Sequence, residues 1–233
     1  GKTTLLRLIL RELIPESGEI ILGEVYITKL PQREIPKLRQ SIGVVFQDFK
    51  VLPERTVREN VEVALAVIDV AKEEWDERVE HVLRLVGLVH ISDLFPSQLS
   101  GGEIQRVSMA RALVVNPEVI LADEPTGNLD WETADKVMEL FDKISEEGKT
   151  IIAATHNQLI VDKMKKRVIK LKGGKVVDKD SGKTPRVEDG KKKPESPMEM
   201  DKDFGQEKPD EQKKPLKSEG SKKVKIKVEE VNK

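Results

Sequence analysis

The sequence predicts an α/β fold with a mainly parallel core sheet, and three observations carry this prediction. Residues 117–123 (PEVILAD) and 150–156 (TIIAATH) are near-continuous apolar runs, a pattern typical of strands covered on both faces. Residues 41–46 (SIGVVF) have the β-branched content of another buried strand. Segments with helical periodicity separate these runs, so we expect crossover connections and parallel strands.

The segments before the first buried strand predict a helix and a small antiparallel unit. Residues 3–13 carry apolar side chains at helical spacing, and the stretch 15–18, which contains Pro and Gly, ends the pattern. Residues 19–22 and 24–28 are short apolar segments joined by one glycine. We interpret them as two short strands of a small antiparallel β subdomain.

Helices dominate the rest of the globular part. Residues 57–72 and 73–88 are amphipathic, and residues 101–115 form a third predicted helix, which together indicate a helical subdomain. Residues 131–148 predict a helix that closes on a glycine. Residues 167–178 contain two apolar segments around Gly-Gly and predict a hairpin.

Composition divides the 233 residues into two parts. Residues 1–180 have the patterning of one globular domain. Residues 181–233 consist mainly of Lys, Glu, Asp and Pro, which cannot bury enough apolar surface to offset the entropy of ordering. We therefore expect a disordered tail, in which only residues 222–231 alternate like a marginal strand.

Composition also excludes several kinds of site. The absence of cysteine rules out disulfides and thiolate chemistry. The three histidines are far apart in sequence, which makes a zinc site improbable on this pattern. The 41 basic and 42 acidic residues nearly balance, so the chain has no excess positive charge that would attract nucleic acid, and no nucleic-acid partner is expected. No apolar run reaches the roughly 18–20 residues of a membrane-spanning helix, so we expect a cytoplasmic protein.

The first four residues read as the second half of a phosphate-binding loop. Gly1 and Lys2 precede Thr3 and Thr4, and a predicted helix follows. Backbone N–H groups at such a helix start cradle phosphates, the lysine reaches the β- and γ-phosphates, and the first hydroxyl ligates Mg²⁺. Taken alone, this tetrapeptide is as compatible with a chance occurrence at a helix start as with a phosphate-binding loop.

Two further stretches support phosphate chemistry. Asp123 and Glu124 end a buried apolar strand, where carboxylates can hold a Mg²⁺ shell and accept a proton from water. Ser100, Gly101 and Gly102 precede a helix and could bind phosphate through hydroxyl and N–H groups. The alternative for the last three is a helix cap, because a serine followed by an acidic residue is a capping pattern.

At these residues the sequence resembles a known family. Residues 99–113 (LSGGEIQRVSMARAL) are similar to the signature motif of ATP-binding-cassette ATPases. The family's other motifs occur in the same order, matched by Gln47, Asp123–Glu124, 128–130 (NLD) and His156. The resemblance covers residues 1 to about 178 and implies a P-loop NTPase cassette with a helical signature subdomain.

The resemblance implies that the chain binds ATP and Mg²⁺ and hydrolyses ATP. Thr3, Gln47 and Asp123 would hold the metal. Glu124 would be the general base, with His156 and Gln47 as further catalytic residues. A poorly cycling binding module is the alternative of another class, and the presence of Glu124 and His156 argues against it.

The resemblance also implies a head-to-tail homodimer that sandwiches the nucleotide. Ser100, Gly101, Gly102 and Asp130 would contact ATP bound mainly by the other protomer. The phosphate loop and the signature are both phosphate-binding helix starts, and one nucleotide needs both.

Residues 45–65 (VFQDFKVLPERTVRENVEVAL) resemble the cell-division branch of the family. This implies a partner, an FtsX-like integral membrane protein, that docks on the region from Gln47 to Arg55 at the inner face of the cell membrane. Phe49, Val51 and Leu52 would form exposed apolar contacts there; the alternative for these three side chains is packing in the core. A lipoprotein-release or macrolide-export ATPase is the nearest alternative.

The family pattern leads us to expect the first half of the phosphate loop, and strands leading into it, before Gly1. On that expectation, residues 1–233 alone would bind ATP weakly and fold marginally.

Overall fold

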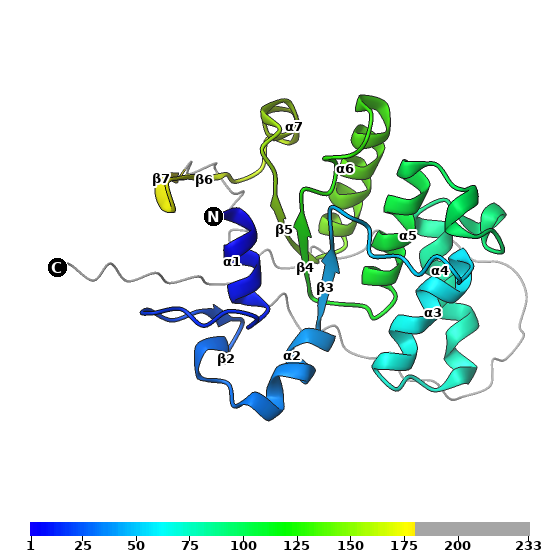
Figure 1. Cartoon of the computed structure of the whole chain (residues 1–233), viewed down its shortest axis with the longest axis horizontal. Helices are drawn as coiled ribbons and strands as arrows, with labels where there is room; N and C mark the ends of the chain where they lie inside the picture. The colour runs from blue at the N-terminus through cyan, green and yellow to red at the C-terminus, as the bar shows by residue number, and fades with distance from the viewer. Residues whose placement is uncertain (180–233) are drawn as a thin grey trace, which may run out of the picture.

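The computed structural model describes residues 1–179. The predicted tail and its marginal strand at 222–231 lie outside these residues. The described part has a central parallel sheet with helices on both faces and two small antiparallel sheets (Figure 1).

The core sheet consists of β3 (Ile42–Val45), β4 (Val119–Asp123) and β5 (Thr150–Ala154), in the order β3-β4-β5. Both pairings are parallel, as the apolar runs predicted. Alternate residues of β4 serve opposite faces: Ile120 belongs to one hydrophobic cluster and Leu121 to the other. A near-continuous apolar run is therefore required, because both faces of this strand are covered.

Helix α1 (Lys2–Ile9) lies on one face of the sheet, and α5 (Gly101–Leu113) and α6 (Trp131–Glu146) lie on the other (Figure 1). Beyond α5 lie α3 (Val57–Val67) and α4 (Trp75–Leu85), which complete the predicted helical subdomain. Gly43 faces α5, and a Cβ at this position would stand 2.7 Å from the Ala112 carbonyl oxygen. Only glycine lets α5 approach β3 this closely.

Two antiparallel sheets flank the core, as predicted. The first pairs β1 (Ile21–Leu22) with β2 (Val25–Tyr26), and the second pairs β6 (Ile169–Lys172) with β7 (Lys175–Lys179). Two short helices, α2 (Ile35–Gln40) and α7 (Gln158–Met164), were not predicted. Their few residues show too little periodicity for a sequence prediction.

Some boundaries differ from the prediction. Helix α3 ends at Val67 rather than at residue 72, because Asp69 takes a left-handed conformation with φ +56°. Helix α1 ends at Ile9, and Arg11 is left-handed with φ +56°.

The expectation that residues 150–156 form a buried strand is only partly right. β5 is one of the two edge strands of the described sheet, and Ala154 is its one buried residue. Beside it lies a cavity of about 380 Å³, lined largely by apolar side chains such as Leu5, Phe141 and Ile160. A strand's burial depends on a neighbour that its own sequence does not specify.

Candidate active site

The start of α1 offers free backbone donors. Gly1 is the N-cap, and the first intrahelical bond runs from the Leu5 N–H to the Gly1 carbonyl. The N–H groups of the preceding first-turn residues have no partner within the helix, as at every helix start. Thr3 and Thr4 are exposed there, and no acidic side chain lies in the first turn. This end of α1 is therefore suited to an anion.

Three predicted metal residues meet at one cavity of about 570 Å³. Its lining includes Thr3 of α1, Gln47 after β3, and Asp123 at the end of β4. They are brought together because β3 and β4 are parallel neighbours, so their carboxyl ends share one sheet edge. The Oδ1 atom of Asp123 is buried and has no hydrogen-bond partner. An unpaired buried carboxylate oxygen beside a hydroxyl and an amide fits an oxygen-coordinated Mg²⁺ ion.

Glu124 follows Asp123 and pairs with two basic side chains. Its carboxylate lies 2.8 Å from His156 Nδ1 and 3.5 Å from Lys2 Nζ. The backbone N–H of His156 donates to Glu124 Oε2 at 3.2 Å. The side chain of Glu124 is 13% exposed, whereas that of His156 is 74% exposed. Two predicted site residues, Lys2 of α1 and His156 after β5, therefore converge on the carboxylate of a third, Glu124, directly after β4.

Opposing effects set the pKa of Glu124. Partial burial alone would raise the pKa of its carboxyl group, but hydrogen bonds from the side chain and backbone of His156 outweigh burial, helped by the charges of His156 and Lys2. The net pKa is lower than usual, so this carboxylate stays ionised and able to accept a proton. Its backbone is left-handed, with φ +46°, a strained conformation that is common at functional sites.

Gln47 is held by the loop that follows β4. The side chain of Asn128 donates to the Gln47 carbonyl at 3.0 Å, and a Cβ at Gly127 would lie 3.3 Å from Gln47 Nε2. Asn128 lines the same cavity as Gln47, although the sequence predicts no role for it beyond its place in the matched motif 128–130. The signal available in the sequence was an amide side chain in the turn that follows the acidic pair Asp123–Glu124.

The signature residues lie apart from this cavity. Ser100, Gly101 and Gly102 do not line it. Ser100 is the N-cap of α5 and forms a capping box with Glu103: the Glu103 N–H donates to Ser100 Oγ at 3.3 Å, and the Ser100 N–H donates to Glu103 Oε2 at 2.8 Å. The Ser100 hydroxyl also donates to Glu103 Oε2, at 2.6 Å. The predicted alternative, a capped helix, is thus present, and the Ser100 hydroxyl is occupied in this state.

Gly102 and Asp130 have structural roles of their own. A Cβ at Gly102 would lie 2.3 Å from Thr133 Cγ2, so glycine lets α5 pack against α6 without displacing the Thr133 side chain. Asp130 is the N-cap of α6, with Oδ1 accepting from the Thr133 N–H at 3.0 Å. This hydrogen bond lowers the pKa of Asp130.

The expected docking region is less exposed than its sequence indicates. Phe49, Val51 and Leu52 are all half-buried, and Val51 packs against the main core. A cavity of about 580 Å³ with largely apolar walls lies close by, between α2, β3 and α3. Apolar surface is thus present in this region, but mostly in the groove rather than on the loop.

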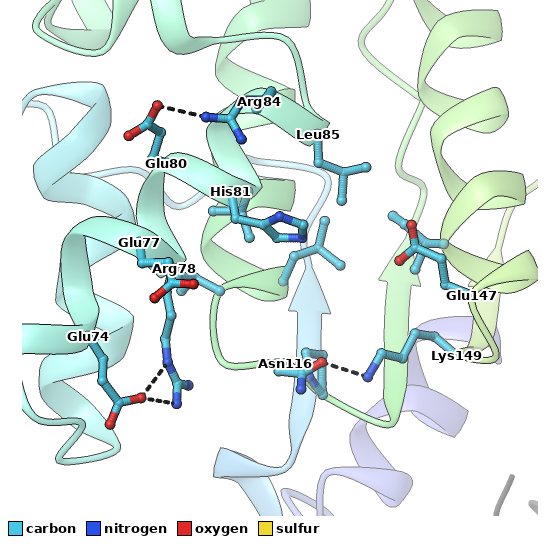
Figure 2. Close-up of a pocket in the computed structure, with 15 residues that line it drawn as sticks. Glu74, Glu77, Arg78, Glu80, His81, Arg84, Leu85, Asn116, Glu147 and Lys149 are labelled. Atoms are coloured by element: carbon cyan, nitrogen blue, oxygen red, sulfur yellow. Dashed lines mark hydrogen bonds and ion pairs between the residues drawn. The ribbon is translucent and has the colours of Figure 1, made fainter. Parts of the chain in front are cut away.

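A larger cavity of about 610 Å³ lies away from all these residues, between α4 and the ends of α5 and α6 (Figure 2). Several of its charged side chains satisfy one another, as in the pairs Glu74–Arg78 and Glu80–Arg84. Lys149 donates to Asn116 at 2.7 Å. None of the predicted site residues lines it.

Sequence comparison identifies the family that uses this arrangement. The sequence model of the ABC transporter family matches residues 1–127. The chain belongs to the ABC transporter ATPase family. This cassette is 49% identical over 181 residues to the cell division ATP-binding protein FtsE of Bacillus subtilis, covering 78% of this chain and 79% of that protein.

Other relatives confirm the cassette fold. The chain is 42% identical over 179 residues to the methionine import ATP-binding protein MetN of Geobacillus kaustophilus, covering 76% of this chain and 52% of that protein. A dimeric ATP-binding cassette in a post-hydrolysis state, bound to ADP and Pi, matches with a TM-score of 0.69 and 38% identity, over 77% of this chain and 80% of that one. The predicted ABC cassette is therefore confirmed, and with it the assignment as an ATPase. No helix in residues 1–179 has the length and apolar character needed to cross a membrane.

Proposed function

We propose that this cassette binds Mg-ATP at the cavity formed by Thr3, Gln47 and Asp123 and hydrolyses it with Glu124 as general base. The convergence of these residues on one sheet edge, beside the Glu124–His156 pair, carries the proposal. When bound, Mg²⁺ would neutralise phosphate charge and orient the phosphates. Thr3 and Asp123 would hold it, with Gln47 completing the oxygen set.

The chain's own residues have distinct tasks in this proposal. Lys2 exchanges its ion pair with Glu124 for a contact with phosphate. The Glu124 carboxylate is then free to take a proton from the attacking water. His156 holds the carboxylate through Nδ1 and its backbone N–H. A second protomer completes the site with its Ser100, Gly101, Gly102 and Asp130. These residues do not line the cavity of their own protomer, so they are available to a nucleotide bound by the other one.

The Glu124→Gln substitution tests the catalytic role. We expect kcat for ATP to fall by roughly 10²–10⁴-fold, the usual contribution of a positioned general base. The readout is steady-state phosphate release by the full chain. Glu147→Gln is the matched control, because Glu147 is exposed and lies at the remote cavity. Equal rates for wild type and Glu124→Gln would exclude Glu124 as the base.

For the biological role, we propose that the cassette is the ATPase subunit of an FtsE/FtsX-like complex. It would act in cell division and cell-wall remodelling, from the cytoplasmic face of the membrane. The 49% identity to FtsE and residues 45–65 support this assignment over an exporter or lipoprotein-release ATPase. The 42% identity to MetN supports methionine import as a second candidate.

Co-purification distinguishes these partners. We expect the full chain to retain an FtsX-like membrane protein, and Phe49→Ala with Leu52→Ala to weaken retention by roughly tenfold or more, as for a central apolar contact. Leu159→Ala is the matched control, since Leu159 is 66% exposed on α7. Recovery of a methionine permease or an export permease instead would contradict the cell-division assignment.

A further inference from the structure

The segment from Phe49 to Thr56 joins Gln47 to helix α3 and begins in an unusual conformation. Phe49 and Lys50 are consecutive non-glycine residues with left-handed backbones, at φ +59° and +52°. Residues with side chains rarely adopt this region, and they stay there only where surrounding contacts hold them. The structure should therefore contain groups that fix this turn.

Arg111, near the end of α5, holds the strained turn. Its Nη1 donates to the Lys50 carbonyl at 2.6 Å and its Nη2 donates to the Phe49 carbonyl at 3.1 Å. The two acceptors belong to the two left-handed residues. A guanidinium group presents two parallel donors to neighbouring oxygens, and an ammonium group does not. Arg111 therefore fixes both peptide groups at once.

Asn60 holds the other end of the segment. It is fully buried on α3, and its Oδ1 accepts from the Leu52 N–H at 2.7 Å. Its Nδ2 lies 2.9–3.0 Å from the carbonyls of Leu52, Arg55 and Thr56. The segment is thus attached to α3 at its end and to α5 at its beginning.

Gln47 sits between these attachments and the loop after β4. Asn128 binds the Gln47 carbonyl, and Arg111 binds the carbonyls two and three residues further on. Helix α5 runs without interruption from Gly101 to Leu113, so Arg111 moves with the signature residues at its start. A displacement of α5 would therefore act on the turn that begins two residues after Gln47.

We propose that Arg111 is a positioning residue for ATP hydrolysis, which couples the orientation of the signature helix α5 to the placement of Gln47. This inference rests on the proposed roles of Gln47 and of the signature residues. Arg111 itself touches neither the cavity lined by Thr3 and Asp123 nor the Glu124 pair. Its effect should thus appear in turnover rather than in ATP binding.

The test compares Arg111→Lys and Arg111→Gln with wild type in the full chain. We expect kcat to fall on the order of tenfold or more in Arg111→Gln, since small misplacements of a site residue reduce turnover strongly. KM for ATP should stay within about twofold, because Thr3 and Asp123 are unchanged. Arg111→Lys should recover only part of the rate. Arg84→Gln, which removes a surface ion pair with Glu80 on α4, is the matched control.

Limited trypsin digestion reports on the turn itself. We expect cleavage after Lys50 to become on the order of tenfold faster in Arg111→Gln. In this variant the turn can open locally without breaking the two hydrogen bonds from Arg111 to the Phe49 and Lys50 carbonyls. Cleavage after Arg55 should change less, because Asn60 still holds that end. Equal acceleration at all sites would indicate general destabilisation and would overturn the inference.

The kinetic outcomes separate this inference from the proposed function. An active wild type with an unchanged kcat in Arg111→Gln overturns the coupling alone. A wild type without ATPase activity overturns the proposed function and the coupling with it. A lower kcat at constant KM, together with selective cleavage after Lys50, supports both.

Discussion

Glu124 shows how one carboxylate can be prepared for catalysis by its neighbours. Burial raises its pKa, and the hydrogen bonds and charge of His156, with the charge of Lys2, more than compensate. The group is therefore ionised before nucleotide arrives, yet it is engaged by Lys2. Binding of phosphate by Lys2 and release of the base are thus one event in the proposed mechanism.

The lowered pKa predicts how stability depends on pH. A carboxyl group whose pKa is lower in the folded state stabilises the fold above its unfolded pKa, near 4.5, and loses that contribution as pH falls through the folded pKa. We expect wild type to be more stable than Glu124→Gln at pH 6, with the difference shrinking below about pH 4.5. Thermal unfolding of both variants between pH 6 and pH 3 measures it. A constant difference over this range would contradict the prediction.

At the scale of elements, the close contacts of α5 with its neighbours explain why glycine stands at two positions. Gly102 allows α5 to pack on Thr133 of α6, and Gly43 allows α5 to approach β3. Gly101, in contrast, has open space where a Cβ would be. Packing therefore explains the glycine at position 102, whereas it does not explain the neighbouring glycine at position 101.

The Gly102–Thr133 contact can be tested by one substitution that creates an overlap and a second substitution that removes it. We expect Gly102→Ala to lower the free energy of unfolding by roughly 1–3 kcal/mol, because the new methyl group overlaps Thr133 Cγ2. Thr133→Ser removes that atom and keeps the backbone N–H that Asp130 caps. The double variant should regain most of the loss. Urea denaturation gives both values, with Gly101→Ala as the control; a loss that Thr133→Ser does not relieve would refute the contact.

At the scale of the whole molecule, one protomer separates the two halves of the proposed nucleotide site. The cavity of Thr3, Gln47 and Asp123 lies at the carboxyl edge of the sheet, and Ser100 lies at the start of α5 outside it. ABC cassettes related to this chain form dimers, as the post-hydrolysis structure does. Dimer formation should then depend on nucleotide.

Light scattering after size exclusion tests this dependence. We expect Glu124→Gln with Mg-ATP to run at twice its nucleotide-free mass, because ATP that is not hydrolysed holds both protomers. Adding Ser100→Arg should keep it at monomer mass, since a bulky side chain there blocks the shared site. Leu159→Arg is a control on an exposed position of α7. Dimers that form equally without nucleotide would contradict the shared site.

The sequence by itself determined the parallel sheet, the helical subdomain and the hairpins, because each follows from a local pattern of a few residues, and its motifs singled out the candidate site residues. Only the tertiary structure decided which of them meet: Lys2 and His156 at Glu124, Asn128 at Gln47, and Arg111 at Phe49 and Lys50. These contacts join residues at least 32 positions apart, so no local pattern specifies them. For the same reason β5 has an apolar sequence but an exposed edge: its burial depends on a neighbouring strand, not on its own residues.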